Sequence, residues 1–393
     1  MSSTNPAYRA HFVDPLRIFL MVLGVVLHAA HVFSPIRHWR INSPHTITFC
    51  YYLIEAIYRF RMPTFFLIAG LSYTRMIQAG RVTGVLKDKF RRIGIPLLAT
   101  AAIFNSLEAF VLHLTDWRMF NVPAYLSEGG WMSHLWFLAC MLCYFTLAEA
   151  LRVWVLPRLP RRQAVRDAVE RLPAQAVLFM LPGITLLMLT LFKLGVPGEW
   201  RLIGTVDLYT LSDYLPFFAF GALLGLSPAL LRLYCRLGVL FTLGVLGAAA
   251  IAEVALPHQQ TLWRAAAHAY LESLISWSAI FLLLGLFSRF MDKPSTVWSR
   301  MGDLSYSVYL FHHFLVVLFG VVLIRLDVSA VLGFPLLMLL ALSGAVILHK
   351  QVVARSAWLQ WLFNGRRLGP RRSQAWRTAS GSGAQVEPDA VSN

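Results

Sequence analysis

The chain has 393 residues, of which 58% are hydrophobic and 14% charged, and its mean hydropathy is +0.61. About a quarter of the residues are charged in ordinary soluble domains, so this composition excludes that class and indicates a polytopic membrane protein. The formal net charge is +16, and its distribution along the chain decides whether it indicates a nucleic-acid partner.

Apolar segments long enough to cross a membrane follow one another along the chain. The hydrocarbon core of a bilayer is about 30 Å thick and requires about 20 helical residues, and backbone groups within it must be paired inside the segment. We therefore predict an all-α polytopic membrane protein with about ten transmembrane helices. The segments lie near residues 15–34, 50–74, 93–114, 133–156, 174–194, 211–227, 237–256, 265–288, 303–324 and 328–349.

The first segment contains the stretch "DPLRIFLMVLGVVLHAAH" (residues 14–31), which carries four ionisable side chains. Asp14 before Pro15 is typical of a helix N-cap. Arg17 and His28 are eleven residues apart, so they lie within about 20° of one helix face and about 16 Å apart along the axis. One face of this helix therefore carries a cation near one end and an imidazole near the other.

The second segment contains "YYLIEAIYRFRMPTFFLIAG" (51–70), which also carries charges. A central Arg costs roughly 2.5–3.5 kcal/mol on insertion scales, so such groups usually face a partner or a cavity. Glu55 and Arg59 have the i,i+4 spacing of an ion pair, which explains them as well as a functional role does. Arg61 has no such local partner, and Pro63 two residues later loosens the helix. Arg61 is therefore the stronger functional candidate.

Lys and Arg residues are concentrated in alternate loops. The loops 75–92 and 152–173 and the segment from Lys350 onward hold most of the 35 cations. This pattern follows the positive-inside rule and predicts that both termini are cytoplasmic, so the charge requires no nucleic-acid partner. We divide the chain into a cytoplasmic N-terminal segment (1–14), a transmembrane domain (15–350) and a basic, partly disordered cytoplasmic tail (351–393).

Five motifs, in order along the chain, resemble those of acyltransferase family 3 membrane proteins. Arg17 and His28 match the family's Arg, ten residues, His signature, and the others are "FRMPTFFLIAG" (60–70), "KFRRIGIP" (89–96), "SHLWFL" (133–138) and "GDLSYSVYLFHH" (302–313). The resemblance covers roughly residues 9–350 and is greatest to a branch that succinylates periplasmic glucans. It implies a multi-pass protein of the bacterial inner membrane with an acyl-CoA donor, a periplasmic glucan acceptor and no further cofactor.

The resemblance also implies where the donor binds. An acyl-CoA cannot cross a bilayer unaided, so it must bind from the cytoplasm, where cations meet its phosphates through charge-assisted hydrogen bonds. The candidates are Arg17, Lys89, Arg91 and Arg92. Lys89 stands where the family's Arg-x-x-Arg begins with Arg, and a Lys offers a phosphate a point charge without the bidentate fork.

Acyl transfer to a sugar requires a base, because a hydroxyl is a poor nucleophile at neutral pH. An imidazole with its ordinary pKa of about 6.5 accepts the proton as attack begins, and we expect His28 to do so. Arg61, or groups around His134 and Trp136, would stabilise the oxyanion. Transfer is either direct or through an acylated histidine. Candidates for positioning donor or acceptor are Asp14, Glu55, Arg59, Trp136, His312 and His313.

Several alternatives stay open. His312 and His313 are equally well explained as packed, hydrogen-bonded residues, and a histidine metal site is disfavoured because no carboxylate is spaced as a further ligand. The acceptor is alternatively another cell-surface polysaccharide or a lipid-linked sugar that receives an acetyl group. A glycan or lipid transporter is a different class, because intramembrane Arg and His also line transport paths, but no inverted repeat is visible. A homo-oligomer is compatible with the sequence.

Overall fold

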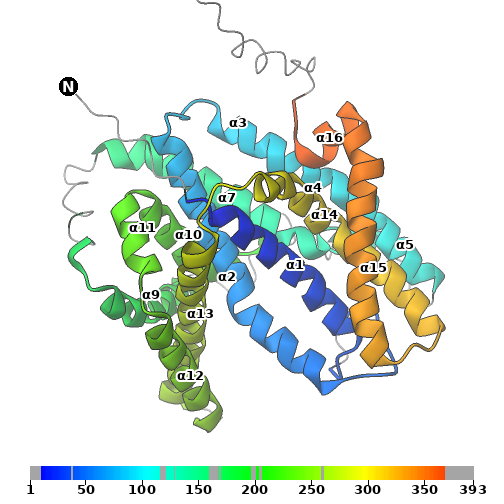
Figure 1. Ribbon diagram of the computed structural model, residues 1–393, viewed down its shortest axis with the longest axis horizontal. Helices are drawn as coiled ribbons and strands as arrows, with labels where there is room; N and C mark the ends of the chain where they lie inside the picture. The colour runs from blue at the N-terminus through cyan, green and yellow to red at the C-terminus, as the bar shows by residue number, and fades with distance from the viewer. Residues whose placement is uncertain are drawn as a thin grey trace, which may run out of the picture.

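The computed structural model describes residues 10–36, 39–115, 121–127, 129–158, 167, 170–195, 201–202, 206–257 and 261–367. The protein is helical and polytopic, as the apolar segments predict (Figure 1). Within the described residues, two strands of two residues each form an antiparallel pair, β1 (Arg201–Leu202) with β2 (Val206–Asp207).

A helix covers each of the ten predicted segments. Two of them are composite: the third is a rod of three α-helices joined by π-helical turns at Phe90–Gly94 and Ala101–Asn105, and the fourth begins with a 3-10 turn at Ser133–Leu135 and ends with turns through Arg158. The α-helices are α1 (Val13–Val32), α2 (Thr48–Gln78), α3 (Val85–Lys89), α4 (Ile95–Thr100), α5 (Ser106–Leu114), α6 (Val122–Ser127), α7 (Trp136–Ala150), α9 (Ala174–Gly195), α10 (Leu208–Gly225), α11 (Pro228–Cys235), α12 (Val239–Ala255), α13 (Leu262–Met291), α14 (Thr296–Arg325), α15 (Ala330–Gln351) and α16 (Ala357–Asn364).

Seven of the helical stretches in the described chain are long and apolar enough to cross a membrane, and an eighth follows if α10 and α11, bent by 119°, form one span. The two remaining predicted segments are α12, which has 17 residues, and α2. α2 is 31 residues long but carries Glu55, Arg59, Arg61 and Arg75. These charges are the feature that makes α2 unusual among the long helices, and they lead to the functional site.

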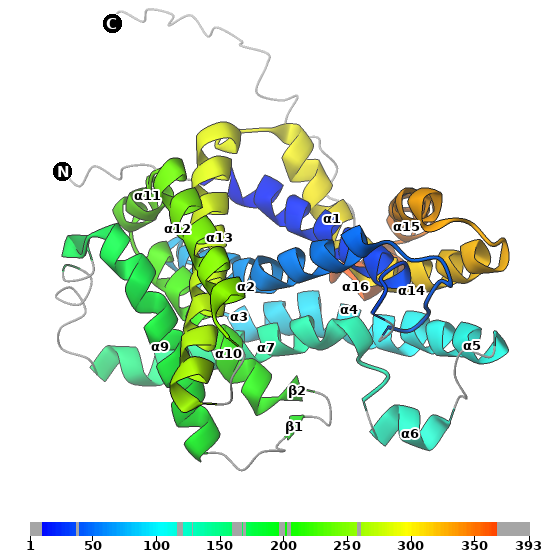
Figure 2. The same cartoon turned by 90° about the horizontal axis from the view of Figure 1, so that it is seen from below.

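α1 and α2 run side by side in the middle of the bundle. Figure 2 shows α9, α10, α12 and α13 at one end of the molecule and α5, α14 and α15 at the other. α2 crosses α10 at two glycines: an added Cβ on Gly70 would overlap the carbonyl of Phe218, and one on Gly221 would overlap the carbonyl of Leu67. Small residues at such crossings let membrane helices approach closely, so these glycines hold α2 against α10.

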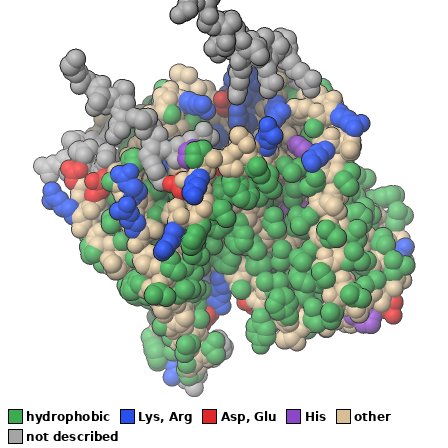
Figure 3. Space-filling view, in the orientation of Figure 1, with side chains coloured by type: hydrophobic (Ala, Val, Ile, Leu, Met, Phe, Trp, Pro, Cys, Tyr) green, Lys and Arg blue, Asp and Glu red, His purple; other side chains and the backbone are tan. Residues whose placement is uncertain are grey.

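The outer surface is apolar over a wide area. Leu240, Val254 and Leu262 are 85–88% exposed, and hydrophobic side chains cover most of the face shown in Figure 3, whereas Lys and Arg gather along its upper edge. An apolar surface of this extent is unfavourable in water and is expected for helices that face lipid.

The C-terminal part of the described chain returns to the bundle. α16 ends at Asn364, and the next residue, Gly365, caps it in the left-handed conformation with a φ of 59°. Nε of Arg91 donates to the Gly365 carbonyl at 3.0 Å. The first part of the predicted tail is therefore folded against the motif that precedes α4. Residues 1–9 of the predicted N-terminal segment and 368–393 of the predicted tail lie outside the described residues.

Candidate active site

Four histidines and an arginine converge on a cavity of about 230 Å³ among α1, α2, α14 and the start of α7. His28 comes from α1, Arg61 from α2, His134 from the turn before α7, and His312 and His313 from α14. The three predicted catalytic residues, His28, Arg61 and His134, thus lie together. His312 and His313, which the sequence explained equally well as packing residues, line the same cavity. Trp136 lines the same cavity.

The ring of His28 packs against the two histidines of α14. Its ring centroid is 4.8 Å from that of His313 and 5.2 Å from that of His312. Nδ1 of His28 is buried and has no hydrogen-bond partner in the described part of the chain. Since buried polar atoms are normally paired, this nitrogen is available to a group that enters the cavity.

His313 is oriented by a carboxylate. Nδ1 of His313 lies 2.6 Å from Oε2 of Glu108 on α5, and both side chains are 4% exposed. Nε of Arg40 lies 3.6 Å from the other carboxylate oxygen. A carboxylate beside Nδ1 fixes the proton there and leaves Nε2 as the acceptor. We missed Glu108 in the sequence, although a lone carboxylate in the apolar segment 93–114 is itself a signal.

His312 and His134 complete the wall. Nδ1 of His312 is 2.7 Å from the carbonyl of Tyr309, so Nδ1 donates and Nε2 carries the lone pair. His134 stacks on His313 with centroids 4.7 Å apart, and neither ring nitrogen of His134 has a hydrogen-bond partner among the described residues. The hydroxyl of Tyr309 donates to the His134 carbonyl at 2.9 Å, which fixes the turn before α7.

Arg61 is buried, with 6% of its surface exposed. Its guanidinium packs on Gly24 of α1, where an added Cβ would lie 2.8 Å from Nη2. Nε of Arg61 has no hydrogen-bond partner within the described residues. Gly24 precedes His28 by one helical turn, so the missing side chain makes room for a cation beside the predicted base.

Two aromatic residues that the sequence analysis passed over also belong to the site. Trp39, in the loop after α1, lies with its ring 5.7 Å from His28 and 5.3 Å from His313. The hydroxyl of Tyr58 is 3.1 Å from Nε2 of His31, and Tyr58 lines the cavity. A loop tryptophan gave no signal of its own, because its role depends on where the loop folds.

The predicted donor-binding cations are partly assembled. Lys89 lies close enough to Arg17 and Arg92 to be repelled by both, and its ammonium is 3.9 Å from the ring centroid of Phe145. Arg92 is exposed. Arg91 differs from the others, because its guanidinium is already bound to Asp88 at 2.8 Å and to the Gly365 carbonyl. Three cations thus stand together and one has a structural role.

The prediction that Asp14 is an N-cap is wrong. α1 begins at Val13, so Asp14 lies inside its first turn and accepts from Arg17 at 3.4 Å. Asp292, which follows α13, instead accepts from the backbone amides of His11 and Phe12 at 2.7 and 3.2 Å. A carboxylate from another helix replaces the local cap.

The prediction that Arg59 pairs with Glu55 is also wrong. Arg59 forms ion pairs with Glu253 at 2.8 Å and with Glu272 at 3.8 Å, because α13 packs on α2 and α12 packs on α13. Glu55 is exposed and lies with Arg59 at a second cavity. In the described residues, no three His, Cys, Asp or Glu side chains are grouped as metal ligands.

Comparison with known proteins now identifies the class. Residues 10–350 match the acyltransferase domain of acyltransferase family 3. The chain belongs to this family. It is therefore an acyltransferase, and its long apolar helices make it a membrane acyltransferase.

This acyltransferase is similar to proteins named glucans biosynthesis protein C. Those of Escherichia coli strains K12 and O157:H7 are each 27% identical to it over 387 residues, and that of strain O1:K1 / APEC is 27% identical over 390 residues. The alignments cover 92% of this chain and 96% of each relative. No solved structure is significantly similar to it.

Proposed function

We propose that this acyltransferase moves a succinyl group from acyl-CoA in the cytoplasm to a hydroxyl of a periplasmic glucan. The observation that carries the proposal is the cavity in which Arg61 and four imidazoles converge. Arg61 and three of these imidazoles, those of His28, His134 and His312, have nitrogens without a hydrogen-bond partner among the described residues. Such a cavity supplies a base for a hydroxyl and a cation for an oxyanion. The name of the Escherichia coli relatives supports a glucan as the acceptor.

The proposed topology has ten crossings in the bacterial inner membrane with both termini in the cytoplasm. It is supported by the helix that covers each apolar segment and by the basic edge in Figure 3. In this orientation Arg17, Lys89 and Arg92 are cytoplasmic, and the end of α1 that holds His28 points toward the periplasm. The phosphates of the donor bind the cations while its thioester reaches the cavity along α1.

The transfer step balances in atoms and charge. His28 takes the proton of the glucan hydroxyl as its oxygen attacks the thioester carbonyl, and Arg61 stabilises the resulting oxyanion. Collapse of this intermediate forms the ester, breaks the carbon–sulfur bond and returns the proton to the departing thiolate. Glu108, held to His313 at 2.6 Å, offsets the positive charge that the cavity gains while His28 is protonated.

The test uses the purified full chain in detergent. Addition of succinyl-CoA and a neutral glucan is expected to release CoA in a glucan-dependent manner and to give a glucan whose mass has increased by succinyl. If CoA is released from acetyl-CoA but not from succinyl-CoA, the transferred group is acetyl and the succinyl proposal is wrong. Movement of glucan into proteoliposomes without CoA release would refute acyl transfer in favour of transport.

A further inference from the structure

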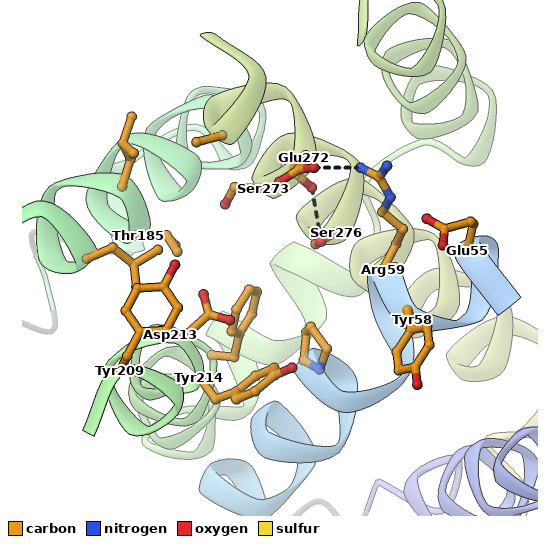
Figure 4. Close-up of a pocket in the computed structure, with 15 residues that line it drawn as sticks. Glu55, Tyr58, Arg59, Thr185, Tyr209, Asp213, Tyr214, Glu272, Ser273 and Ser276 are labelled. Carbon is orange, nitrogen blue, oxygen red and sulfur yellow. Dashed lines mark hydrogen bonds and ion pairs between the residues drawn. The ribbon is translucent and has the colours of Figure 1, made fainter. Parts of the chain in front are cut away.

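A second cavity, of about 340 Å³, lies among α2, α9, α10 and α13 (Figure 4). Its volume is in the range of about 300–1,000 Å³ that is usual for ligand sites. Tyr58 lines both this cavity and the candidate active site. Tyr214 of the second cavity lies against Trp136 of the first, with ring centroids 5.7 Å apart. The two cavities therefore meet at a shared aromatic wall.

Polar groups without partners face this second cavity. Oγ of Ser273 and Nη1 of Arg59 are buried and have no hydrogen-bond partner in the described chain, although Nη1 is 3.8 Å from Glu272 in an ion pair. Figure 4 shows Asp213, next to Tyr214 on α10, pointing into the space toward α13. Among the described residues, no hydrogen bond or ion pair engages Asp213, although Lys193 on α9 lies near enough to attract it. Unpaired donors and acceptors around a cavity indicate a polar ligand.

The charges of the lining decide which polar ligand. Three carboxylates line the cavity, those of Glu55, Asp213 and Glu272. Arg59 is the sole Lys or Arg among the lining residues, all of which are described, and it is already bound to Glu253 at 2.8 Å. Beyond the lining, the ammonium of Lys193 lies 4.8 Å from the ring centroid of Tyr209. Three carboxylates therefore face two cations, so the balance of charge still disfavours an anion, whereas hydroxyl groups donate well to carboxylates.

Aromatic side chains provide the complementary apolar surface. Tyr209 and Tyr214 lie on either side of Asp213 in Figure 4, and Tyr58 closes the side toward the active site. A tyrosine ring offers an apolar face and a polar edge, and here the rings stand among carboxylates that accept from hydroxyl groups. This lining suits a ligand that also has apolar faces and polar edges. A neutral sugar has this character.

We propose that the second cavity holds the sugar units of a neutral acceptor glucan that adjoin the unit being acylated. The inference rests on the proposed function for the identity of that reaction. Most of the lining residues of α2, α10 and α13 lie in the halves of those helices near Thr48, Leu208 and Leu262, which the proposed topology places toward the periplasm. A glucan entering from that side spans both cavities, whereas a single glucose occupies the active site alone.

Binding measured by calorimetry on the full chain in detergent tests the proposal without requiring catalysis. Neutral gluco-oligosaccharides of several units should bind more tightly than glucose. Asp213→Asn should weaken oligosaccharide binding about tenfold, the loss expected when a hydrogen bond to a charged acceptor is weakened, and leave glucose binding unchanged. Tyr209→Ala should weaken it similarly, whereas Tyr209→Phe, which keeps the ring, should restore it.

Asp327→Asn is the matched control, because Asp327 is 81% exposed and pairs with His45 away from the cavity. Equal affinity for glucose and oligosaccharides, or wild-type affinity in both Asp213→Asn and Tyr209→Ala, would overturn the inference. A different result would refute the proposed function and leave this inference standing. In that case oligosaccharides bind and Asp213→Asn weakens their binding, yet no CoA is released from any acyl-CoA. Thermal melting of each variant shows that it is folded.

Discussion

His313 and Glu108 are 205 positions apart in the sequence, and in the structure Nδ1 of His313 lies 2.6 Å from Oε2 of Glu108. The pair joins α14 to α5 beside the ring of His28, whose centroid is 4.8 Å from that of His313. Because the carboxylate holds one nitrogen of His313, the orientation of this ring is fixed before any substrate arrives. The site thus contains a preorganised histidine next to the predicted base.

Replacement of Glu108 tests that orientation. Glu108→Ala should lower the rate of acyl transfer by about 100-fold or more, within the range for lost acid–base function, because it removes both the anchor of His313 and its negative charge. Glu108→Gln keeps an oxygen that accepts from Nδ1 of His313, so its rate of acyl transfer should fall less. Single-turnover rates at saturating donor measure both. Equal rates in Glu108→Ala and wild type, at equal membrane abundance, would contradict the role.

His28 and His31 form a matched pair of variants on one helix. His28→Ala should reduce the transfer rate by about 100-fold to 10,000-fold, as expected for a lost general base, while acyl-CoA binding is retained. His31→Ala should be much milder, because the side chain of His31 hydrogen-bonds to the Tyr58 hydroxyl. Transfer within a few-fold of wild type in His28→Ala would move the base to another imidazole, with His313 first.

The donor-side cations predict a difference between neighbouring arginines. Arg17→Ala or Arg92→Ala should weaken acyl-CoA binding by roughly 1.5 kcal/mol, the lower end of the range for a hydrogen bond to a charged group, because water reaches these side chains. Arg91→Ala should mainly lower thermal stability, since Arg91 holds Asp88 and the Gly365 carbonyl. Donor titrations distinguish the two effects. Unchanged affinity in both Arg17→Ala and Arg92→Ala rules out the proposed donor site.

Gly24 offers a way to displace Arg61 without changing its charge. In Gly24→Ala the new Cβ would lie 2.8 Å from Nη2 of Arg61, so the guanidinium must move away from its place beside His28. Transfer should slow by about tenfold to 100-fold, within the effect of a misplaced oxyanion donor, while the helix itself gains about 1 kcal/mol of propensity. Gly244→Ala on α12, where nothing lies within 4 Å, should be silent. Full activity in Gly24→Ala would contradict the proposal that Arg61 stabilises the oxyanion.

The proposed topology is open to a direct check. Reporter fusions in the loops 75–92 and 152–173 should report the cytoplasm, and fusions in 114–132 and 193–210 the periplasm, because Lys and Arg are retained on the cytoplasmic side. The same reporter fused to either terminus of the full chain gives the signal with which the loop fusions are compared. A periplasmic signal from the first two loops would remove the basis for donor binding at Lys89 and Arg92.

The sequence by itself determined the helical class, the places of the long apolar helices and the family. These are local properties: a run of about 20 apolar residues becomes a helix in lipid whatever surrounds it, and short motifs such as Arg17 with His28 are read along one chain. Helix periodicity also predicts that these two residues share one face of α1.

Only the tertiary structure decided which side chains meet. Arg59 has a suitable carboxylate four residues away in Glu55, yet it pairs with Glu253 and Glu272. Glu108 becomes part of the site through His313, and Trp39 through the fold of a loop. The physical reason is that periodicity gives the face of a helix on which a residue lies, whereas the partner across that face depends on how the helices pack, and this packing is set by distant contacts such as Gly70 and Gly221 at the crossing of α2 with α10.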